Sequence, residues 1–233
     1  MKHSAPLAHI DSHMSKLFIF DVDGTLVDSN DFHALAWEKA FLQKGKTIPI
    51  QRIRREIGKG ADQLLPVFLT KKEIAEFGED LDELQGDIFM RDYFSQVRPF
   101  PKVRELFKAI HDADGKIALA SSSDKKHLEQ YETIAQLEGL IDECASGDDA
   151  KRTKPAPDIF QIAMQRLGNP PKDSVILVGD TPHDALAAQK AGLQIVGVRC
   201  GGFPEADLKS SGCFAVYEDP ADILANLKGL LNH

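Results

Sequence analysis

The sequence has few of the features that mark disulfide-rich, zinc-binding or membrane-spanning proteins. Its three cysteines lie far apart, without CxxC or Cys/His ligand spacing, which argues against a disulfide framework or a zinc site and predicts reduced thiols in the cytoplasm. Apolar runs are only a few residues long, too short for a membrane-spanning helix. Basic charge is in deficit, and the formal net charge of −8 argues against nucleic acid or an anionic membrane surface as a partner.

The composition that is present is globular. The chain has 233 residues, 42% hydrophobic and 27% charged, which suits one α/β domain with a small insertion rather than two full domains. Residues 1–13 contain an acid and no apolar segment, so they are not expected to be a signal peptide. Because Ser12 and His13 precede a second methionine, Met14, we expect residues 1–13 to be a vector-derived leader.

The remaining chain alternates between apolar segments typical of buried strands and helical patterns. Strands are predicted at 16–21, 116–121, 141–145, 174–178 and 194–198, with a weaker one at 213–217. Helical patterns lie between them at 102–113, 125–137, 157–167 and 182–191. This alternation predicts an α/β fold with helices on both faces of a parallel sheet. The segment from about 30 to 96 is helical throughout, and we expect it above the C-terminal edge of the sheet, where it could act as a lid.

Two aspartates follow the first predicted strand. Asp21 and Asp23 come directly after the apolar run Leu17–Phe20, so they are expected at the edge where open α/β sheets bind ligands. Two carboxylates about 4 Å apart repel by about 4 kcal/mol at an effective dielectric of 20, so the pair needs a cation or a shared proton. A divalent metal is the simplest interpretation. Asp-x-Asp-Gly is also a common turn sequence, and a turn alone would need no partner residues elsewhere.

Hydroxyl groups follow the second predicted strand. Ser121, Ser122 and Ser123 precede Asp124 and a helix, and hydroxyls with free backbone N–H groups at a helix start are suited to bind phosphate. Ser123 or Asp124 can also serve as the cap of that helix. The two roles are compatible, and we assign Ser121 to the ligand.

A lysine and two further acids complete the pattern. A lone lysine is usually a solvated surface charge, but Lys154 stands before Pro155 and Pro157, which determine its position tightly. Asp180 is expected at the tip of the strand at 174–178 and Asp184 one helical turn beyond, so the two can face one site. Parallel strands bring these groups to one edge, where acids, a hydroxyl, a lysine and a metal are the components of phosphoryl transfer.

In this order the segments resemble the four signature motifs of the haloacid dehalogenase superfamily. The motifs are D-x-D-G-T after a strand, a strand ending in hydroxyls, K-P-x-P-D-I-F and G-D-T-x-x-D, and the resemblance spans residues 16–230. The helical insertion is similar to the C1-type cap of the phosphoglycolate phosphatase and β-phosphoglucomutase branch. The resemblance implies a Rossmann-like, doubly wound parallel sheet built from residues 14–29 and 97–233, with an all-helical C1 cap domain at 30–96.

The resemblance also implies roles for the matching residues. Asp21 is expected to form an aspartyl-phosphate, and Asp23 to protonate the leaving oxygen and then activate water. Mg²⁺ is expected on the Asp21 carboxylate, the Asp23 backbone carbonyl and Asp180. Asp184 is expected to support the water shell of the metal or Lys154.

The phosphoryl oxygens are expected to be held by Ser121, the N–H group of Ser122 and Lys154. The presence of Asp23 argues against a dehalogenase or a phosphonatase, because both lack this aspartate in the superfamily. Lys59 does not align with the cap lysine of the phosphonatases. A non-catalytic binding module of the same fold is the alternative of another class, but such a module would be expected to have lost one of the core residues.

Mutase chemistry is the closer alternative. Phe32–Trp37 resembles the cap start of the β-phosphoglucomutases, but the cap arginine with which they bind a second phosphate aligns near Ala61. Loss of this arginine favours hydrolysis. Candidate specificity residues in the cap are His33, Arg55 and Lys59, although a lone histidine near Trp37 is more commonly part of a packed cap core.

These observations together predict a Mg²⁺-dependent phosphatase that acts on a small phosphorylated metabolite. Phosphoglucomutase-like phosphoryl transfer remains the alternative. Sugar phosphates, phosphoglycolate and nucleotide monophosphates all fit the pattern. We expect the protein to be cytoplasmic and to be a monomer or a weak homodimer.

Overall fold

A computed structural model describes residues 16–233, and the leader predicted at 1–13 lies outside the described residues. The sheet is parallel throughout, with strand order β3-β2-β1-β4-β5-β6. Its strands are β1 (Leu17–Phe20), β2 (Lys116–Ala120), β3 (Glu143–Ala145), β4 (Val175–Gly179), β5 (Gln194–Val198) and β6 (Ala215–Tyr217). Each predicted strand is present with its ends shifted by at most two residues, and the α/β doubly wound fold class is confirmed.

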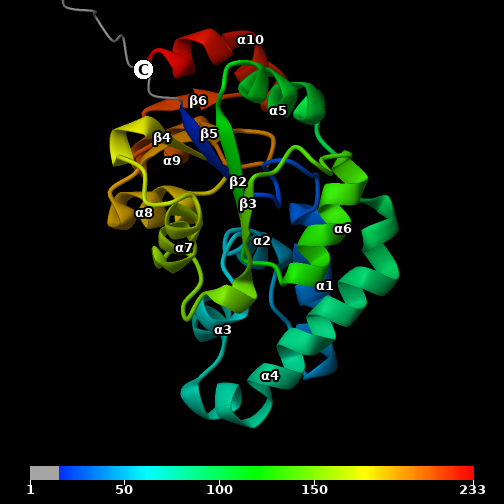
Figure 1. The fold of residues 1–233 in the computed structure, drawn as a ribbon. Coiled ribbons are helices and arrows are strands. Elements are labelled where there is room, and N and C mark those ends of the chain that lie inside the picture. Colours follow the sequence, from blue (N-terminus) through cyan, green and yellow to red (C-terminus); the bar gives the residue numbers. More distant parts are fainter. Residues whose placement is uncertain (1–15) are drawn as a thin grey trace, which may run out of the picture.

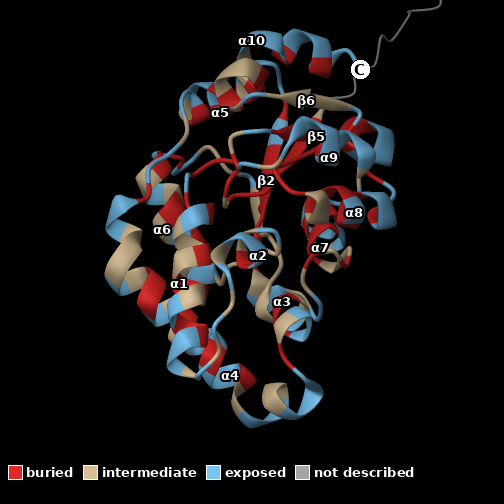
Figure 2. Ribbon diagram, turned by 180° about the vertical axis from the view of Figure 1, so that it is seen from behind, coloured by how far each residue is buried: buried red, intermediate tan, exposed pale blue. Residues whose placement is uncertain are grey.

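Helices cover both faces of the sheet (Figure 1). One face carries α5 (Val103–Asp112), α6 (Lys125–Ala135) and α10 (Pro220–Leu231), and the other carries α7 (Asp158–Arg166), α8 (Pro182–Ala191) and α9 (Glu205–Ser210). Alternate residues of each strand point to opposite faces, so Phe18 and Phe20 join one buried cluster and Ile19 joins the other. Figure 2 shows the central strands buried and the outer helix faces exposed.

Two C-terminal helices were missing from the sequence prediction. α9 has only six residues, and α10 follows the weak strand β6. The start of α10 did carry a local signal, because Asp219 accepts a hydrogen bond from the Asp222 N–H group at 2.9 Å and Pro220 occupies the first helical position.

The helical segment, residues 30–96, lies below most of the sheet in Figure 1. It comprises α1 (Asn30–Gln43), α2 (Ile50–Arg54), α3 (Ala61–Phe68), α4 (Lys71–Ile88) and two short turns of helix, Phe89–Tyr93 and Phe94–Gln96. Aromatic contacts among Trp37, Phe41 and Phe68 pack α1 against α3. The buried apolar cluster of the α5 face continues into this segment. No helix within residues 16–233 is long and apolar enough to cross a bilayer.

Candidate active site

The candidate site lies where the strand order reverses. The chain runs from β1 to β2 and β3 on one side, and to β4, β5 and β6 on the other. Ligands of open α/β sheets bind at the carboxyl ends of strands beside such a switch point. Asp21 directly follows β1 and Asp180 directly follows β4, so both stand at this position.

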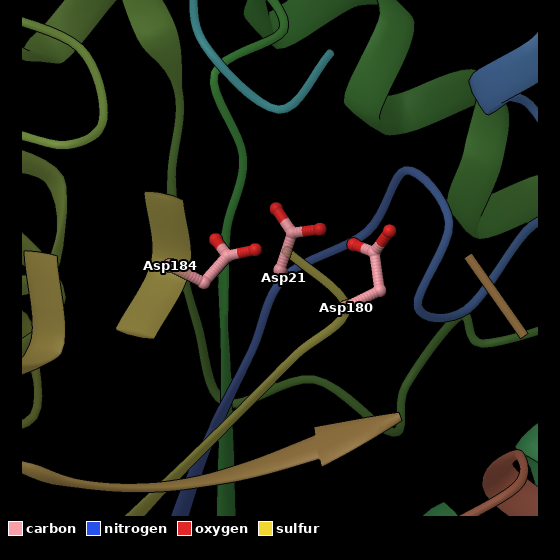
Figure 3. A group of neighbouring side chains, drawn as sticks. All are labelled: Asp21, Asp180 and Asp184. Carbon is pink, nitrogen blue, oxygen red and sulfur yellow. The ribbon is translucent and has the colours of Figure 1, made fainter. Parts of the chain in front are cut away.

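Three buried carboxylates converge here. One oxygen atom from each of Asp21, Asp180 and Asp184 lies within 4.8 Å of the others. Figure 3 shows the three side chains pointing into one space from separate backbone segments, with Asp21 in the middle. Asp180 and Asp184 are fully buried. The structure therefore brings together three acids that the sequence placed after two different strands.

Lys154 is the ammonium group among these acids. Its side chain is 1% exposed, forms an ion pair with Asp21, and places Nζ 2.8 Å from Oδ1 of Asp184. The second oxygen of Asp184 accepts hydrogen bonds from the backbone N–H group (3.1 Å) and hydroxyl (2.6 Å) of Thr181. Asp184 is thus held by the capping box of α8 while it contacts Lys154.

One lysine does not compensate three buried acids. Burial raises the pKa of Asp21 to about 7, against the opposing effect of Lys154 and with help from the nearby charges of Asp184 and Asp23. Burial and the charges of Asp21 and Asp184 also raise the pKa of Asp180 well above its ordinary value. Burial lowers the pKa of Lys154, but the two acids beside it outweigh that effect and raise it. The site is therefore short of positive charge.

Thr25 and Asn30 contact these acids. The sequence prediction gave neither residue a role. The Thr25 hydroxyl lies 3.3 Å from Oδ2 of Asp21 and 3.2 Å from Oδ1 of Asp180. The Asn30 amide donates to Oδ2 of Asp180 at 2.7 Å and to the carbonyl of Gly201 at 3.1 Å. Thr25 belongs to the D-x-D-G-T motif, so its position was a signal; Asn30 carried none, because its contact depends on the packing of α1 on the sheet edge.

Two glycines make room for Asp180. Gly24 has a φ of +77°, and a Cβ atom there would overlap the side chains of Asn30 and Asp180. A Cβ atom on Gly201 would overlap the Asp180 carboxylate. Both positions therefore require glycine.

Asp23 stands apart from the three converging acids and is surrounded by hydrogen-bond donors. Its Oδ1 lies 2.6 Å from the Ser29 hydroxyl and 3.0 Å from Nε2 of His33. Its Oδ2 accepts from the hydroxyls of Ser123 at 2.9 Å and Ser121 at 3.4 Å. Burial alone would raise the pKa of Asp23, but His33 and the hydroxyl donors hold it well below its ordinary value.

His33 connects Asp23 to α6 of the sheet core and to α4 of the helical segment. Its Nε2 also lies 3.2 Å from the hydroxyl of Tyr131 on α6, and its Nδ1 lies 3.3 Å from Nε2 of Gln85 on α4. The ring stacks on Phe89 with centroids 3.9 Å apart. The structure thus places His33 against a predicted catalytic acid as well as in an aromatic stack. Neither residue was found from the sequence, because Tyr131 lies about a hundred residues from His33 along the chain and Gln85 about fifty.

The serine segment lies on the other side of Asp23. Ser121 is fully buried and accepts a hydrogen bond from the Ser123 N–H group at 3.0 Å. Asp124 caps α6 by accepting from the N–H group of His127 at 2.8 Å, as expected. The Ser122 hydroxyl faces the carbonyl of Gly58 at 3.5 Å.

Of the other two cap candidates, Lys59 belongs to a loop that touches the site, whereas Arg55 reaches α8 only with its backbone carbonyl, 3.0 Å from Nε2 of His183. The loop that holds Lys59 approaches the site through Gly58, while Lys59 itself forms an ion pair with Glu56. Arg55 is exposed and lines a groove of about 830 Å³ together with residues of α1, α2 and the segment 202–207. None of the three converging acids lines that groove.

Comparison with known proteins gives a consistent result. The model of the family described as haloacid dehalogenase-like hydrolase matches residues 18–198. Phosphoglycolate phosphatase of Nitrosospira multiformis is 29% identical over 206 residues, which cover 86% of this chain and 90% of that protein. Phosphorylated carbohydrates phosphatase of Thermotoga maritima is 28% identical over 214 residues, covering 91% and 98%. The crystal structure of a hydrolase from Pseudomonas syringae matches with a TM-score of 0.85 and 29% identity, covering 92% of this chain and 99% of that one.

Proposed function

The chain belongs to the haloacid dehalogenase-like hydrolase family, and from this premise we propose that it is a Mg²⁺-dependent phosphatase that cleaves a small phosphorylated metabolite through an aspartyl-phosphate on Asp21. The observation that carries the proposal is the position of Asp21, buried at the switch point and in contact with Lys154. Relatives named for phosphoglycolate and for phosphorylated carbohydrates support a phosphomonoester as substrate.

The residues of this chain divide the reaction into two steps. The Asp21 carboxylate attacks phosphorus, the bond from phosphorus to the ester oxygen breaks, and Asp23 gives its proton to the leaving oxygen. Asp23 then takes a proton from a water molecule as that water attacks phosphorus. The bond between phosphorus and Asp21 breaks, and inorganic phosphate leaves. The donors around Asp23 favour its ionised form in the free protein. The first step uses the protonated form, and the second step starts from the ionised form and returns the proton to it.

The phosphoryl group would be held by donors at the same edge. Lys154 offers an ammonium group beside Asp21, and the Ser121 hydroxyl and the N–H group of Ser122 lie at the end of β2. Charge-assisted hydrogen bonds of this kind stabilise the charge on the transferring group.

The donor set also fits a metal. Three buried carboxylates beside a single ammonium are short of positive charge, and carboxylate oxygens are the ligands that Mg²⁺ prefers. Asp21, Asp180 and the backbone carbonyl of Asp23 would hold the ion. Bound there, Mg²⁺ would neutralise charge on the phosphoryl oxygens.

The helical segment would serve as the cap, with residues 14–29 and 97–233 as the catalytic core. Ala61 begins α3 and offers no charge for a second phosphate, which supports hydrolysis over mutase-type transfer. A non-catalytic module would be expected to have lost one of Asp21, Asp23, Lys154 and Asp180, and all four are present. The three cysteines are free, which supports the assignment to the cytoplasm.

The test is hydrolysis of an aryl phosphate by the purified protein and two matched variants. Asp21→Asn is expected to lower kcat by about 10³-fold or more while the fold is retained. Asp173→Asn, an exposed acid before the amino end of β4, is expected to keep wild-type activity. A chelator should abolish turnover, and added Mg²⁺ should restore it. Undiminished turnover by Asp21→Asn would refute the covalent mechanism, and full activity in chelator would refute the metal assignment.

A further inference from the structure

The cap loop, residues 56–60, touches the candidate site at two points. The Gly58 carbonyl faces the Ser122 hydroxyl at 3.5 Å, and a Cβ atom on Gly58 would press on Thr181, the residue after Asp180. Gly60 donates its N–H group to the Thr153 hydroxyl at 3.0 Å, next to Lys154. Lys59 lies between these two contacts in the chain, so it belongs to the loop that borders the site.

Lys59 is already neutralised. Its ammonium group forms an ion pair with Glu56 of the same loop, and the two side chains are only 14% and 20% exposed. Both charges also act on His183 in the first turn of α8. Burial lowers the pKa of His183 and the hydrogen bond to the Arg55 carbonyl opposes this effect; the charge of Lys59 lowers the pKa further, and the charges of Asp184 and Glu56 raise it. The cap loop thus presents a donor and an acceptor beside α8, with no net charge.

Three other basic side chains of the stretch 44–59 follow the same pattern. Lys44 pairs with Asp80, Lys46 with Glu73, and Arg54 with Asp31. Arg52 is exposed and lies over the Phe68 ring, and Arg55 is exposed on the groove described above. The run of basic residues at 44–59 therefore does not become a positive surface over the site.

Two acids, Asp62 and Asp124, lie close to the cap loop and to the serine segment. Asp62 accepts hydrogen bonds from Thr153, the residue that Gly60 also contacts, and Asp124 caps α6 after the serine segment. Burial, and then the charges of Asp62, Glu83 and Asp124, raise the pKa of Asp82 of α4. A second anionic group on a substrate would therefore meet like charge at these acids and a compensated lysine in the cap loop.

Resting on the proposed phosphatase function, we propose that the site takes phosphomonoesters of uncharged, hydroxylated alcohols, such as polyol or sugar phosphates, and discriminates against phosphoesters that carry a carboxylate or a second phosphate. Hydroxyl groups can donate to Glu56 and accept from Lys59 without breaking their ion pair. A carboxylate would have to compete with Glu56 for Lys59, and the displaced Glu56 would remain partly buried without a partner.

The matched substrates are glycerol 3-phosphate and 3-phosphoglycerate, which share a three-carbon skeleton and differ in a hydroxymethyl group against a carboxylate. The wild type is expected to hydrolyse glycerol 3-phosphate with a kcat/KM at least about tenfold higher, a difference of ~1.4 kcal/mol. Equal values, or a preference for 3-phosphoglycerate, would overturn the proposal whatever the variants show.

The variant Glu56→Gln tests whether the ion pair between Glu56 and Lys59 causes this preference. It frees the charge of Lys59, so the ratio of the two kcat/KM values is expected to move toward 3-phosphoglycerate by about tenfold. Asp80→Asn removes the acid from another ion pair of the helical segment and should leave the ratio unchanged. An unchanged ratio in Glu56→Gln would contradict the role of the pair. If Glu56→Gln does not fold, Lys59→Met gives the second reading: it should keep the wild-type preference, and reversal of that preference would contradict the proposal.

An aryl phosphate separates this proposal from the one on which it rests. If no variant and no wild-type sample hydrolyses the aryl phosphate with Mg²⁺, the proposed function fails. If the aryl phosphate is hydrolysed, but the ratio of kcat/KM for glycerol 3-phosphate and 3-phosphoglycerate differs from the expected values in the wild type or in Glu56→Gln, only the substrate class is refuted.

Discussion

The carboxyl edge of the sheet and the helical segment hold their charges in opposite ways. At the sheet edge, Asp21, Asp180 and Asp184 share one lysine inside the protein. In the helical segment, an ion pair such as that of Lys44 with Asp80 lies at the surface and matches one cation with one acid. Unbalanced buried charge is costly and persists where chemistry needs it. The contrast assigns reaction to the sheet edge and selection of the alcohol to the helical segment.

Removal of Lys154 should have the largest effect on this contrast. Lys154→Met leaves Asp21 and Asp184 without their ammonium partner, so we expect the free energy of unfolding at pH 8 to fall by about 3–5 kcal/mol. Phosphate release should fall by about 10²-fold or more because a donor to the phosphoryl group is lost. Urea denaturation and steady-state kinetics measure the two effects. Wild-type stability in this variant would show that the acids do not depend on Lys154.

The second prediction concerns metal and pH. Because the pKa of Asp21 is raised to about 7 in the folded protein, and that of Asp180 is raised too, these two groups bind more protons in the metal-free folded state than in the unfolded chain. Stability from these groups is therefore present at low pH and lost as pH rises toward the raised value. Mg²⁺ competes with those protons and should stabilise the protein more at pH 8 than at pH 5.5.

The measurement is Tm with chelator and with Mg²⁺ at both pH values. Mg²⁺ at about 100 times its Kd is expected to add about 2.7 kcal/mol at pH 8. The difference between the two Tm shifts is the informative quantity, because other groups contribute to the pH dependence in both conditions. A shift of equal size at pH 5.5 would contradict the proposed metal set.

A third prediction joins the two regions through Tyr131. Its hydroxyl lies 3.2 Å from Nε2 of His33, which contacts Asp23, so Tyr131→Phe should impair the orientation of the proposed acid. We expect a loss of about tenfold in kcat for glycerol 3-phosphate and a smaller loss for an aryl phosphate, whose leaving group needs little help from an acid. Tyr217→Phe on β6 is the matched control. Equal losses on both substrates would reduce Tyr131 to a packing role.

The smallest effect is expected in the helical segment itself. Asp80→Asn breaks an ion pair in which Asp80 is 71% exposed, and exposed pairs contribute between zero and about 1 kcal/mol. Urea denaturation should therefore give a change below about 1 kcal/mol. A fall in the free energy of unfolding as large as that expected for Lys154→Met would contradict the proposed difference between the two regions.

The sequence predicted the sheet edge well because its signals are local. An apolar strand followed by Asp21, or by Asp180, can be recognised from a few neighbouring residues. Asn30, Gln85 and Tyr131 were not found, since each acts only through the tertiary packing that brings α1, α4 and α6 to the site.

The cap loop shows the same limit in another form. The sequence places Lys59 among basic residues and suggests positive charge at the site. The ion pair with Glu56, three residues earlier, reverses that impression. Such pairing depends on side-chain placement in a loop between helices, for which the helical pattern carries no information. α10 is a different case, because its capping residue Asp219 was visible in the sequence.

The most direct test is to trap the phosphoryl group on the protein. In Asp23→Asn, an aryl phosphate can still transfer its phosphoryl group, because its leaving group needs no acid, but water is no longer activated. We predict that acid-quenched samples carry one hydroxylamine-sensitive phosphoryl group per chain, on the peptide that contains Asp21. A label on another residue, or unlabelled protein at every time point while the wild type turns over, would contradict Asp21 as the nucleophile.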